Sequence, residues 1–309
     1  MTSSRRILIV TSDWHSGHRL GLMNPETVLY EQLIDGKHIN GKSKDGIGKL
    51  DYTLGEYQNY LWHDIWLPAI DRINQIADGS PVGMIVNGDI THGNKYPDQL
   101  ITTSMANQFL IAEGCIKPWL EQVPGLNFVR FAIGTGSHIF NESTSPVIVS
   151  ELLKPKYPNV DIGVVHHGLV HAGGVKIDYA HHGPSQGIRE WTKGNQLRYY
   201  LKSIMSAAYK NGDKPPDAVF RSHYHYPHRE IVTEYITEYI TEHVTEYQRG
   251  DQGRPRTVES RIYLTPSMCG MNDYAQQASR SAPAIYNGFM VLEIENGRIV
   301  NDHLDDFVW

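Results

Sequence analysis

The hydrophobic residues of this chain fall mainly into short continuous runs that end at polar residues. Such runs cover residues 5–11 and 81–86, and the shorter or interrupted stretches 127–133, 175–180 and 218–221 also predict strands. Apolar runs of this length predict strands that are buried on both faces. We therefore expect a buried sheet, with polar side chains at the strand ends.

Longer segments between these runs have the spacing of helices. Residues 56–77 carry apolar side chains at helical spacing interrupted by Pro68, and residues 102–121 and 190–210 are also helix-like. Strands that alternate with helices indicate an α/β fold with layered sheets and helices. The second half looks more antiparallel, because glycine turns join its short strands and Asn296-Gly297 is a strong hairpin signal.

Two segments interrupt this pattern. Residues 17–50 are rich in glycine and predict a long surface excursion, which is either a lid or substrate-specificity loop or a plain insertion. Residues 233–247 repeat Thr-Glu-Tyr-Ile with small variations, and their β-forming composition predicts a ribbon projecting within 230–260. One alternative is a helix with a drifting apolar stripe. The other is a repeat that merely occupies a sheet edge or an oligomer contact. We expect residues 1–309 to form a single domain.

Composition narrows the class of protein. The net charge of −6 disfavours a broad basic surface for nucleic acid, although a nucleic-acid substrate stays compatible with it. Two cysteines imply no disulfide framework, and no apolar run reaches the ~18 residues of a membrane helix. The first apolar run is too short for a signal peptide. We expect a cytoplasmic protein with no membrane partner.

The chemistry-bearing side chains stand where the strand-like runs end. Carboxylates and imidazoles together suit Mn, Fe, Zn or Co, and side chains at the same edge of a sheet can share an ion. Each motif alone has a plainer interpretation; Asp89, for example, could cap the following segment. Five segments carry the pattern: Ser12-Asp13-Trp14-His15, Asn87-Gly88-Asp89, Gly136-Ser137-His138, His181-His182-Gly183-Pro184 and Ser222-His223-Tyr224-His225.

In this order the five segments resemble the calcineurin-like metallophosphoesterase family, and their forms look most like the phosphoesterases of phages and prophages. The resemblance implies a two-sheet β-sandwich flanked by helices, with four layers in all. It also implies that Asp89 bridges two metals, that His138 faces the substrate, and that His223 and His225 bind the second and first metal. The implied metal ligands are Asp13, His15, Asp89, Ser137, His182, His223 and His225.

Two of these assignments stay open. Adjacent residues of a strand point to opposite faces, so only one of His181 and His182 is expected to bind metal; we prefer His182 because the family more often has this histidine directly before glycine. Ser137 stands where the family has asparagine, and either binds through its hydroxyl or leaves the position to water. Ile139 lacks the usual acidic group, for which Asn141 or Glu142 could compensate. This departure predicts a weaker second metal site.

The function predicted on this basis is hydrolysis of a phosphodiester by a hydroxide that bridges two divalent transition metals. Manganese is the preferred ion, with Fe, Zn, Co and Ni as alternatives, and the substrate is expected to be a nucleotide or DNA. Aromatic residues of the 52–66 segment either stack on the substrate or belong to the helix core. The competing predictions are a non-catalytic binding module that keeps the scaffold, and an assembly component that forms homo-oligomers through residues 233–247.

Overall fold

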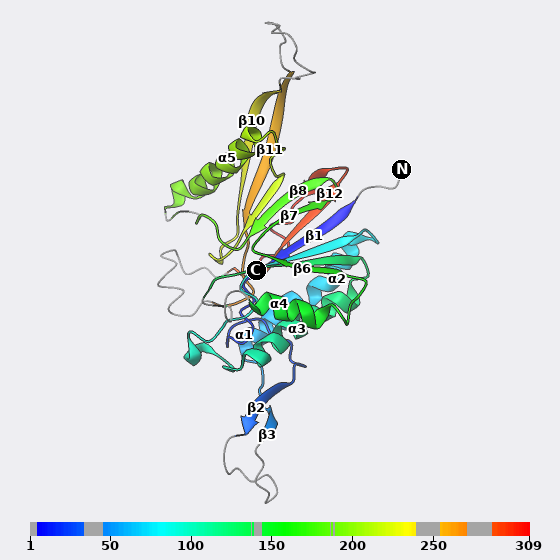
Figure 1. Cartoon of the computed structure of the whole chain (residues 1–309), viewed down its shortest axis with the longest axis vertical. Helices are drawn as coiled ribbons and strands as arrows, with labels where there is room; N and C mark the ends of the chain where they lie inside the picture. The colour runs from blue at the N-terminus through cyan, green and yellow to red at the C-terminus, as the bar shows by residue number, and fades with distance from the viewer. Residues whose placement is uncertain are drawn as a thin grey trace, which may run out of the picture.

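The computed structural model describes residues 5–33, 46–136, 138, 144–185, 187, 189–238, 254–270 and 286–309. These residues form a mixed α/β structure with three sheets (Figure 1). The six-stranded sheet has the spatial order β13 (Arg298–Asn301), β12 (Met290–Glu295), β1 (Arg6–Thr11), β4 (Val82–Asn87), β5 (Leu126–Ala132) and β6 (Asp161–Val165). The five-stranded sheet has the order β10 (His228–Glu238), β11 (Arg254–Leu264), β9 (Ala218–Arg221), β8 (Val175–Ala180) and β7 (His167–Ala172).

The directions of the strands decide where their polar ends meet. In the six-stranded sheet, β1, β4, β5 and β6 are parallel neighbours. In the five-stranded sheet, β8, β9 and β11 are parallel neighbours, while β7 and β10 pair antiparallel at the two edges. The expectation of an antiparallel second half is therefore correct for β7 and β10, and for β12, which pairs antiparallel with β1 and forms the expected hairpin with β13. The carboxyl ends of β8 and β9 lie together for the same reason as those of β1, β4 and β5.

The expected helices are present, with one distortion. The 56–77 segment consists of α1 (Glu56–Asn59), a π-helical stretch (Tyr60–Trp66) and α2 (Pro68–Ala77). Pro68 begins α2, where its missing N–H costs least, so the interruption lies where the sequence places it. The other helices are α3 (Met105–Gln122), α4 (Thr144–Leu153) and α5 (Asn195–Lys210), with short 3-10 turns at Pro97–Gln99 and Glu190–Thr192.

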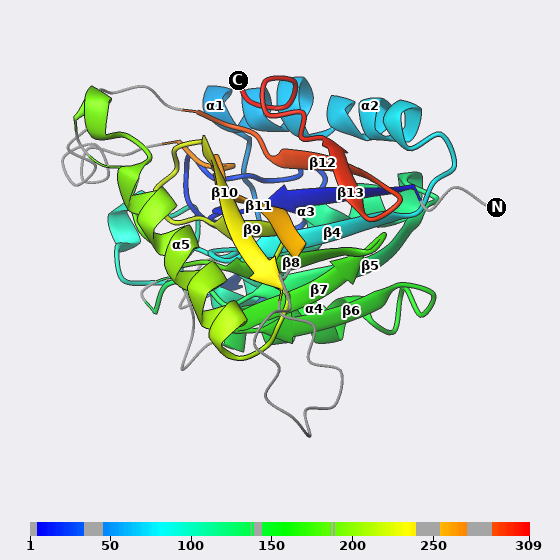
Figure 2. The ribbon, with the colours of Figure 1, turned by 90° about the horizontal axis from the view of Figure 1, so that it is seen from above.

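Three apolar clusters hold the elements together. The first joins one face of the six-stranded sheet to the helices of the 56–77 and 105–153 segments. The second contains side chains from both larger sheets, such as Leu8 and Ile85 from one and Ile177 and Phe220 from the other. In the third cluster, Leu197 and Leu201 of α5 pack on Val219 of the five-stranded sheet. The view from above shows α5 outside the five-stranded sheet and α1 and α2 beyond β12 (Figure 2).

The two unusual segments have different outcomes. Within 17–50, β2 (Leu29–Leu33) and β3 (Gly46–Leu50) pair as a separate ribbon, but Leu22 and Met23 are buried in the first cluster, so the excursion is not entirely superficial. Residues 233–238 of the repeat lie in β10 and pair along β11, as the β-ribbon prediction requires. In Figure 1 these two strands extend away from the rest of the fold. Residues 239–247 lie outside the described residues.

The aromatic residues of the 52–66 segment belong to the core. Trp62 and Trp66 are buried, and Tyr52, Tyr57 and Tyr60 pack against the first cluster. The helix-core alternative is therefore correct, and these rings form no substrate platform. Within the described part of the chain, no helix has the length and apolar character needed to cross a membrane.

Candidate metal centre

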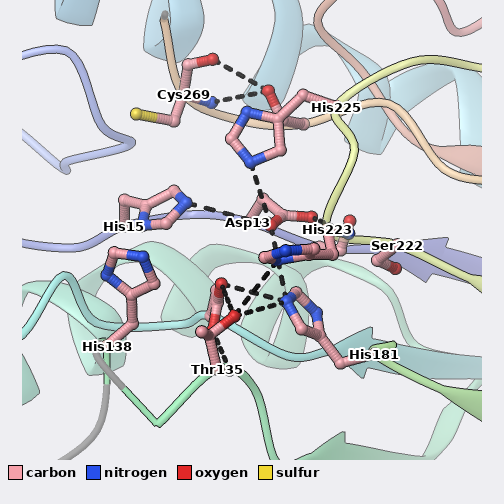
Figure 3. A network of polar contacts seen from close by, with 12 residues as sticks. Asp13, His15, Thr135, His138, His181, Ser222, His223, His225 and Cys269 are labelled. Atoms are coloured by element: carbon pink, nitrogen blue, oxygen red, sulfur yellow. Dashed lines mark hydrogen bonds and ion pairs between the residues drawn. The ribbon is translucent and has the colours of Figure 1, made fainter. Parts of the chain in front are cut away.

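The polar segments that follow five strands converge at one place (Figure 3). The backbone N–H of Asp13, after β1, donates to Gly88 O at 3.1 Å, and that of His15 donates to Asp89 O at 3.0 Å. Within the five-stranded sheet, Ser222 N after β9 donates to His181 O after β8 at 2.9 Å. Parallel strands end at the same edge of their sheet, so the topology brings these segments together.

The backbone at this edge is strained. Eight non-glycine residues of the described part have positive φ, a region that side chains with a Cβ seldom adopt. Five of the eight are Asp13, His15, Asp89, His223 and His225. Such conformations cost of order 1–3 kcal/mol each and cluster at functional sites. The positive φ values accompany two closely spaced pairs, Asp13 with His15 and His223 with His225, whose members both contribute to the centre.

One group of candidate ligands consists of Asp13, His15 and His225. His225 Nε2 lies 3.0 Å from Asp13 Oδ1, and His15 Nε2 lies 3.8 Å from the same oxygen. Burial by itself would raise the pKa of Asp13, but the nearby His225 and His181 imidazoles bring it below its usual value. Asp13 is therefore a buried carboxylate that stays ionised among imidazoles.

A second group consists of Asp89, His181 and His223. His181 Nε2 lies 3.0 Å from Asp89 Oδ2, while its Nδ1–H donates to Asn87 O at 2.7 Å. Thr135 supports the carboxylate, since its N–H donates to Asp89 Oδ1 and its hydroxyl to Oδ2 at 2.9 Å. His181 Nε2 also lies 3.9 Å from Asp13 Oδ1, which joins the two groups.

The charges of the second group depend on one another. Burial would lower the pKa of His181, but Asp89 and Asp13 outweigh it and raise that pKa to about 9. Burial likewise opposes ionisation of Asp89, whose pKa is nevertheless held well below its usual value by His181. A proton on His181 Nε2 thus occupies the position between an imidazole and a carboxylate that a divalent cation takes in metal sites.

A third group adds one histidine, His92, that sequence reasoning did not identify. His15, His92 and His138 bring ring nitrogens together, with His92 Nδ1 3.2 Å from His15 Nδ1. His138 Nδ1–H donates to His92 O at 2.7 Å. Burial lowers the pKa of His92 to about 3 and that of neighbouring His18 to about 4, so both are neutral at pH 7. The position of His92, three residues after Asp89, is the only sequence signal that could have pointed to it.

The groups fit divalent transition metals by their donor chemistry. They combine two buried carboxylates with several imidazoles; burial lowers the pKa of His223 to about 4 and that of His15 well below its usual value, so these two rings are neutral and able to bind a cation. His92 Nε2 is buried and has no hydrogen-bond partner among the described residues. These residues could hold metal ions.

Most of the sequence-predicted site residues are brought together, with two exceptions. Asp13, His15, Asp89, His138, His223 and His225 all lie in the three groups. Ser137 lies outside the described residues, as do Ile139, Asn141 and Glu142, so the predicted weakness of a second metal site stays a prediction. The preferred His182 is not in any group, whereas its alternative His181 is.

The inward position of His181 has a steric and a periodic cause. Its ring occupies the space beside Gly88, where a Cβ would lie 2.3 Å from His181 Nδ1. Along β8, the buried residues alternate as Val175, Ile177 and Tyr179, and His181 continues this alternation. His182 is exposed, with its ring 4.8 Å from that of His223. The alternation was visible in the sequence and would have selected His181.

Ser222 joins the two larger sheets beneath the centre. Its hydroxyl oxygen accepts a hydrogen bond from Asn87 Nδ2 at 2.7 Å and lies 2.7 Å from Thr265 Oγ1. Thr265 Oγ1 is in turn 2.7 Å from Ser12 Oγ. All of these groups are buried. The side chain is therefore accommodated by partners from the ends of other strands.

Comparisons with known proteins give only distant likenesses. The structure of a protein of unknown function, AQ665 from Aquifex aeolicus, shares 11% sequence identity over 72% of this chain and 80% of that chain, with a TM-score of 0.27. The sulfate thiohydrolase SoxB of Thermus thermophilus, solved in complex with glycerol, shares 12% identity over 96% of this chain and 55% of that chain, with a TM-score of 0.34. The chain thus spans about half of SoxB, and neither likeness carries an argument about activity. No protein-family model and no curated protein matches the chain.

Proposed function

We propose that the protein is a metal-dependent phosphoesterase that hydrolyses a phosphodiester derived from a nucleotide or nucleic acid. The observation that carries the proposal is the pair of adjoining groups, Asp13–His15–His225 and Asp89–His181–His223, at the carboxyl ends of strands. The order of the motifs and the succession of helices, two sheets and α5 support the metallophosphoesterase architecture. We also take residues 1–309 as one domain.

In this proposal each group would hold one divalent cation, with manganese as the preferred ion. Bound ions would supply positive charge beside the phosphoryl oxygens and a water of lowered pKa as the nucleophile. His181 replaces His182 in the ligand set, because it contacts both carboxylates. The two groups adjoin at His181, whose Nε2 lies 3.0 Å from Asp89 Oδ2 and 3.9 Å from Asp13 Oδ1.

The residues around the ligands have separate tasks. Thr135 fixes both oxygens of Asp89 by two hydrogen bonds. His138 is oriented by its Nδ1–H bond to His92 O, which leaves Nε2 as the atom that can hold a proton. Its ring lies 4.6 Å from that of His15, beside the first group. We propose that His138 stabilises developing charge on the phosphoryl group or gives a proton to the leaving oxygen.

The test combines metal content with turnover. The purified full-length protein is supplied with Mn²⁺, its bound metal is measured by mass spectrometry, and its hydrolysis of bis(p-nitrophenyl) phosphate is followed. We expect Asp89→Asn and His223→Ala to lose bound metal and to lower kcat/KM by at least about 100-fold, beyond the ~10–100-fold typical for removal of an outer-shell partner. His167→Ala is the control, because this exposed histidine pairs with Asp178 on the outside of β8. Undiminished activity in Asp89→Asn would overturn the proposal.

A further inference from the structure

The rim of the metal centre carries an exposed aromatic ring inside the last ligand motif. Tyr224 stands between His223 and His225, and its side chain is 39% exposed. Its ring centroid lies 5.3 Å from that of His223. Since the two flanking histidines are directed inward, Tyr224 places an aromatic surface at the opening of the centre.

A second segment is held against the chain that leaves this motif. Lys193 Nζ lies 3.3 Å from Tyr226 Oη and 5.3 Å from the centroid of the Tyr226 ring. Gly194 lies so close to the start of β10 that a Cβ would be 2.9 Å from His228 Nε2. The turn 190–194 is therefore packed along residues 226–230, directly beyond His225.

Among the described residues, this turn presents the most exposed aromatic side chain. Trp191 is 79% exposed, whereas Trp14, Trp62, Trp66 and Trp119 are buried. Packing thus explains the four buried tryptophans but not Trp191. An open pocket of about 380 Å³ adjoins the turn, and its lining includes Arg189, Asn195 and Gln196. Its size is in the range of small-ligand sites.

We propose that Tyr224, Lys193 and Trp191 form a subsite for single-stranded nucleic acid, leading from the metal centre outward. Exposed aromatic rings stack on unpaired bases of any sequence, and a lysine of the same segment as Trp191 would pair with a phosphate of the strand. Arg189 and the amides of Asn195 and Gln196 would contact the next nucleotide in the pocket. The proposal rests on the proposed function, whose substrate it narrows to a strand with unpaired bases.

Single strands fit this rim better than duplexes. Bases in a duplex are already stacked on one another, so isolated exposed rings offer them nothing to bind. A duplex would instead need a broad basic surface, and the chain has a net charge of −6. The rim therefore combines local cations with aromatic rings on an otherwise acidic protein.

The test measures binding separately from chemistry. A fluorescein-labelled oligothymidylate is titrated with the full-length protein in EDTA, so that the strand is not cut, and anisotropy is recorded. Trp191→Ala and Lys193→Ala should each weaken binding about tenfold, since a stacked base or a phosphate contact is worth roughly that factor. Tyr224→Phe should keep the wild-type affinity. Tyr30→Ala is the matched control, because Tyr30 is 48% exposed on β2, in the separate two-stranded sheet.

Hydrolysis of bis(p-nitrophenyl) phosphate by the Mn²⁺-loaded wild type is measured in parallel. If the wild type cleaves this ester but Trp191→Ala, Lys193→Ala and Tyr30→Ala bind the strand equally well, the subsite is wrong and the proposed function stands. If strand binding falls in Trp191→Ala and Lys193→Ala but the wild type cleaves nothing, the subsite stands and the function is wrong. Equal affinity for a duplex of the same length would overturn the single-strand proposal.

Discussion

The two larger sheets contribute different chemistry to the centre. The strand ends of the six-stranded sheet bring both carboxylates, Asp13 and Asp89, together with His15. Those of the five-stranded sheet bring imidazoles only: His181, His223 and His225. Neither sheet alone provides the two complete groups, so the candidate metal centre exists only where the sheets are packed together.

This division ties the site to the fold. Asn87 and Gly88 of one sheet contact His181 and Ser222 of the other directly, beneath the ligands. The contacts between the sheets and the contacts within the site are therefore partly the same contacts. We call this contact of Asn87 and Gly88 with His181 and Ser222 the seam. Substitutions at the seam should show what each sheet contributes to metal binding and to stability.

The largest effect is expected where the imidazole sheet meets both carboxylates. His181→Ala removes the side chain that lies 3.0 Å from Asp89 Oδ2 and 3.9 Å from Asp13 Oδ1. We expect kcat/KM for a phosphodiester to fall by about 1,000-fold, equivalent to ~4 kcal/mol of transition-state stabilisation. His182→Ala, one residue further, should change it by less than about threefold. The reverse ranking of the two variants would restore His182 as the ligand.

An intermediate effect is expected from crowding the seam. Gly88→Ala places a Cβ 2.3 Å from His181 Nδ1 at a φ of +95°, so the ring must shift and the backbone is strained. We expect a loss of about 3 kcal/mol in the free energy of unfolding, measured by urea denaturation, with weaker metal binding. Gly79→Ala, with a φ of +77° and nothing within 4 Å, isolates the backbone strain. Equal losses in the two variants would mean that the seam tolerates the added methyl group.

The smallest effect is expected from the hydroxyl that links the sheets. Ser222→Ala leaves Asn87 Nδ2 without its 2.7 Å acceptor in a buried place. We expect a loss of about 1–2 kcal/mol in the free energy of unfolding. Ser203→Ala is the control, since that exposed hydroxyl bonds only Tyr200 O of its own helix. A Ser222 variant as stable as this control would show that the Ser222 hydroxyl does not contribute to joining the sheets.

Local patterns in the sequence were sufficient for the elements and for most of the centre. Continuous apolar runs predicted β1 and β4, because a strand buried on both faces needs no polar side chains until it ends, and shorter or interrupted stretches predicted β5, β8 and β9. The carboxylates and imidazoles after these runs were then the natural candidates, and Asp13, His15, Asp89, His138, His223 and His225 do lie together. The coarse α/β class follows from the same alternation of strands and helices.

What could not be predicted depended on contacts between distant segments. His92 and His18 join the centre because turns after β4 and β1 fold back over it. Trp191 is exposed, although nothing in its local sequence distinguishes it from the buried tryptophans. Ser222 is accommodated because Asn87 and Thr265 come from strands on either side.

The sequence by itself determined which residue types end the strands, and with them the class of chemistry that this edge can support. Only the tertiary structure decided that the ring of His181 lies against Gly88 of the opposite sheet, although the alternation along β8 already favoured this residue over His182. It also decided which aromatic rings face solvent, since burial depends on what packs across from a side chain. Short-range periodicity is written in the chain, whereas complementarity across the seam arises only when the two sheets meet.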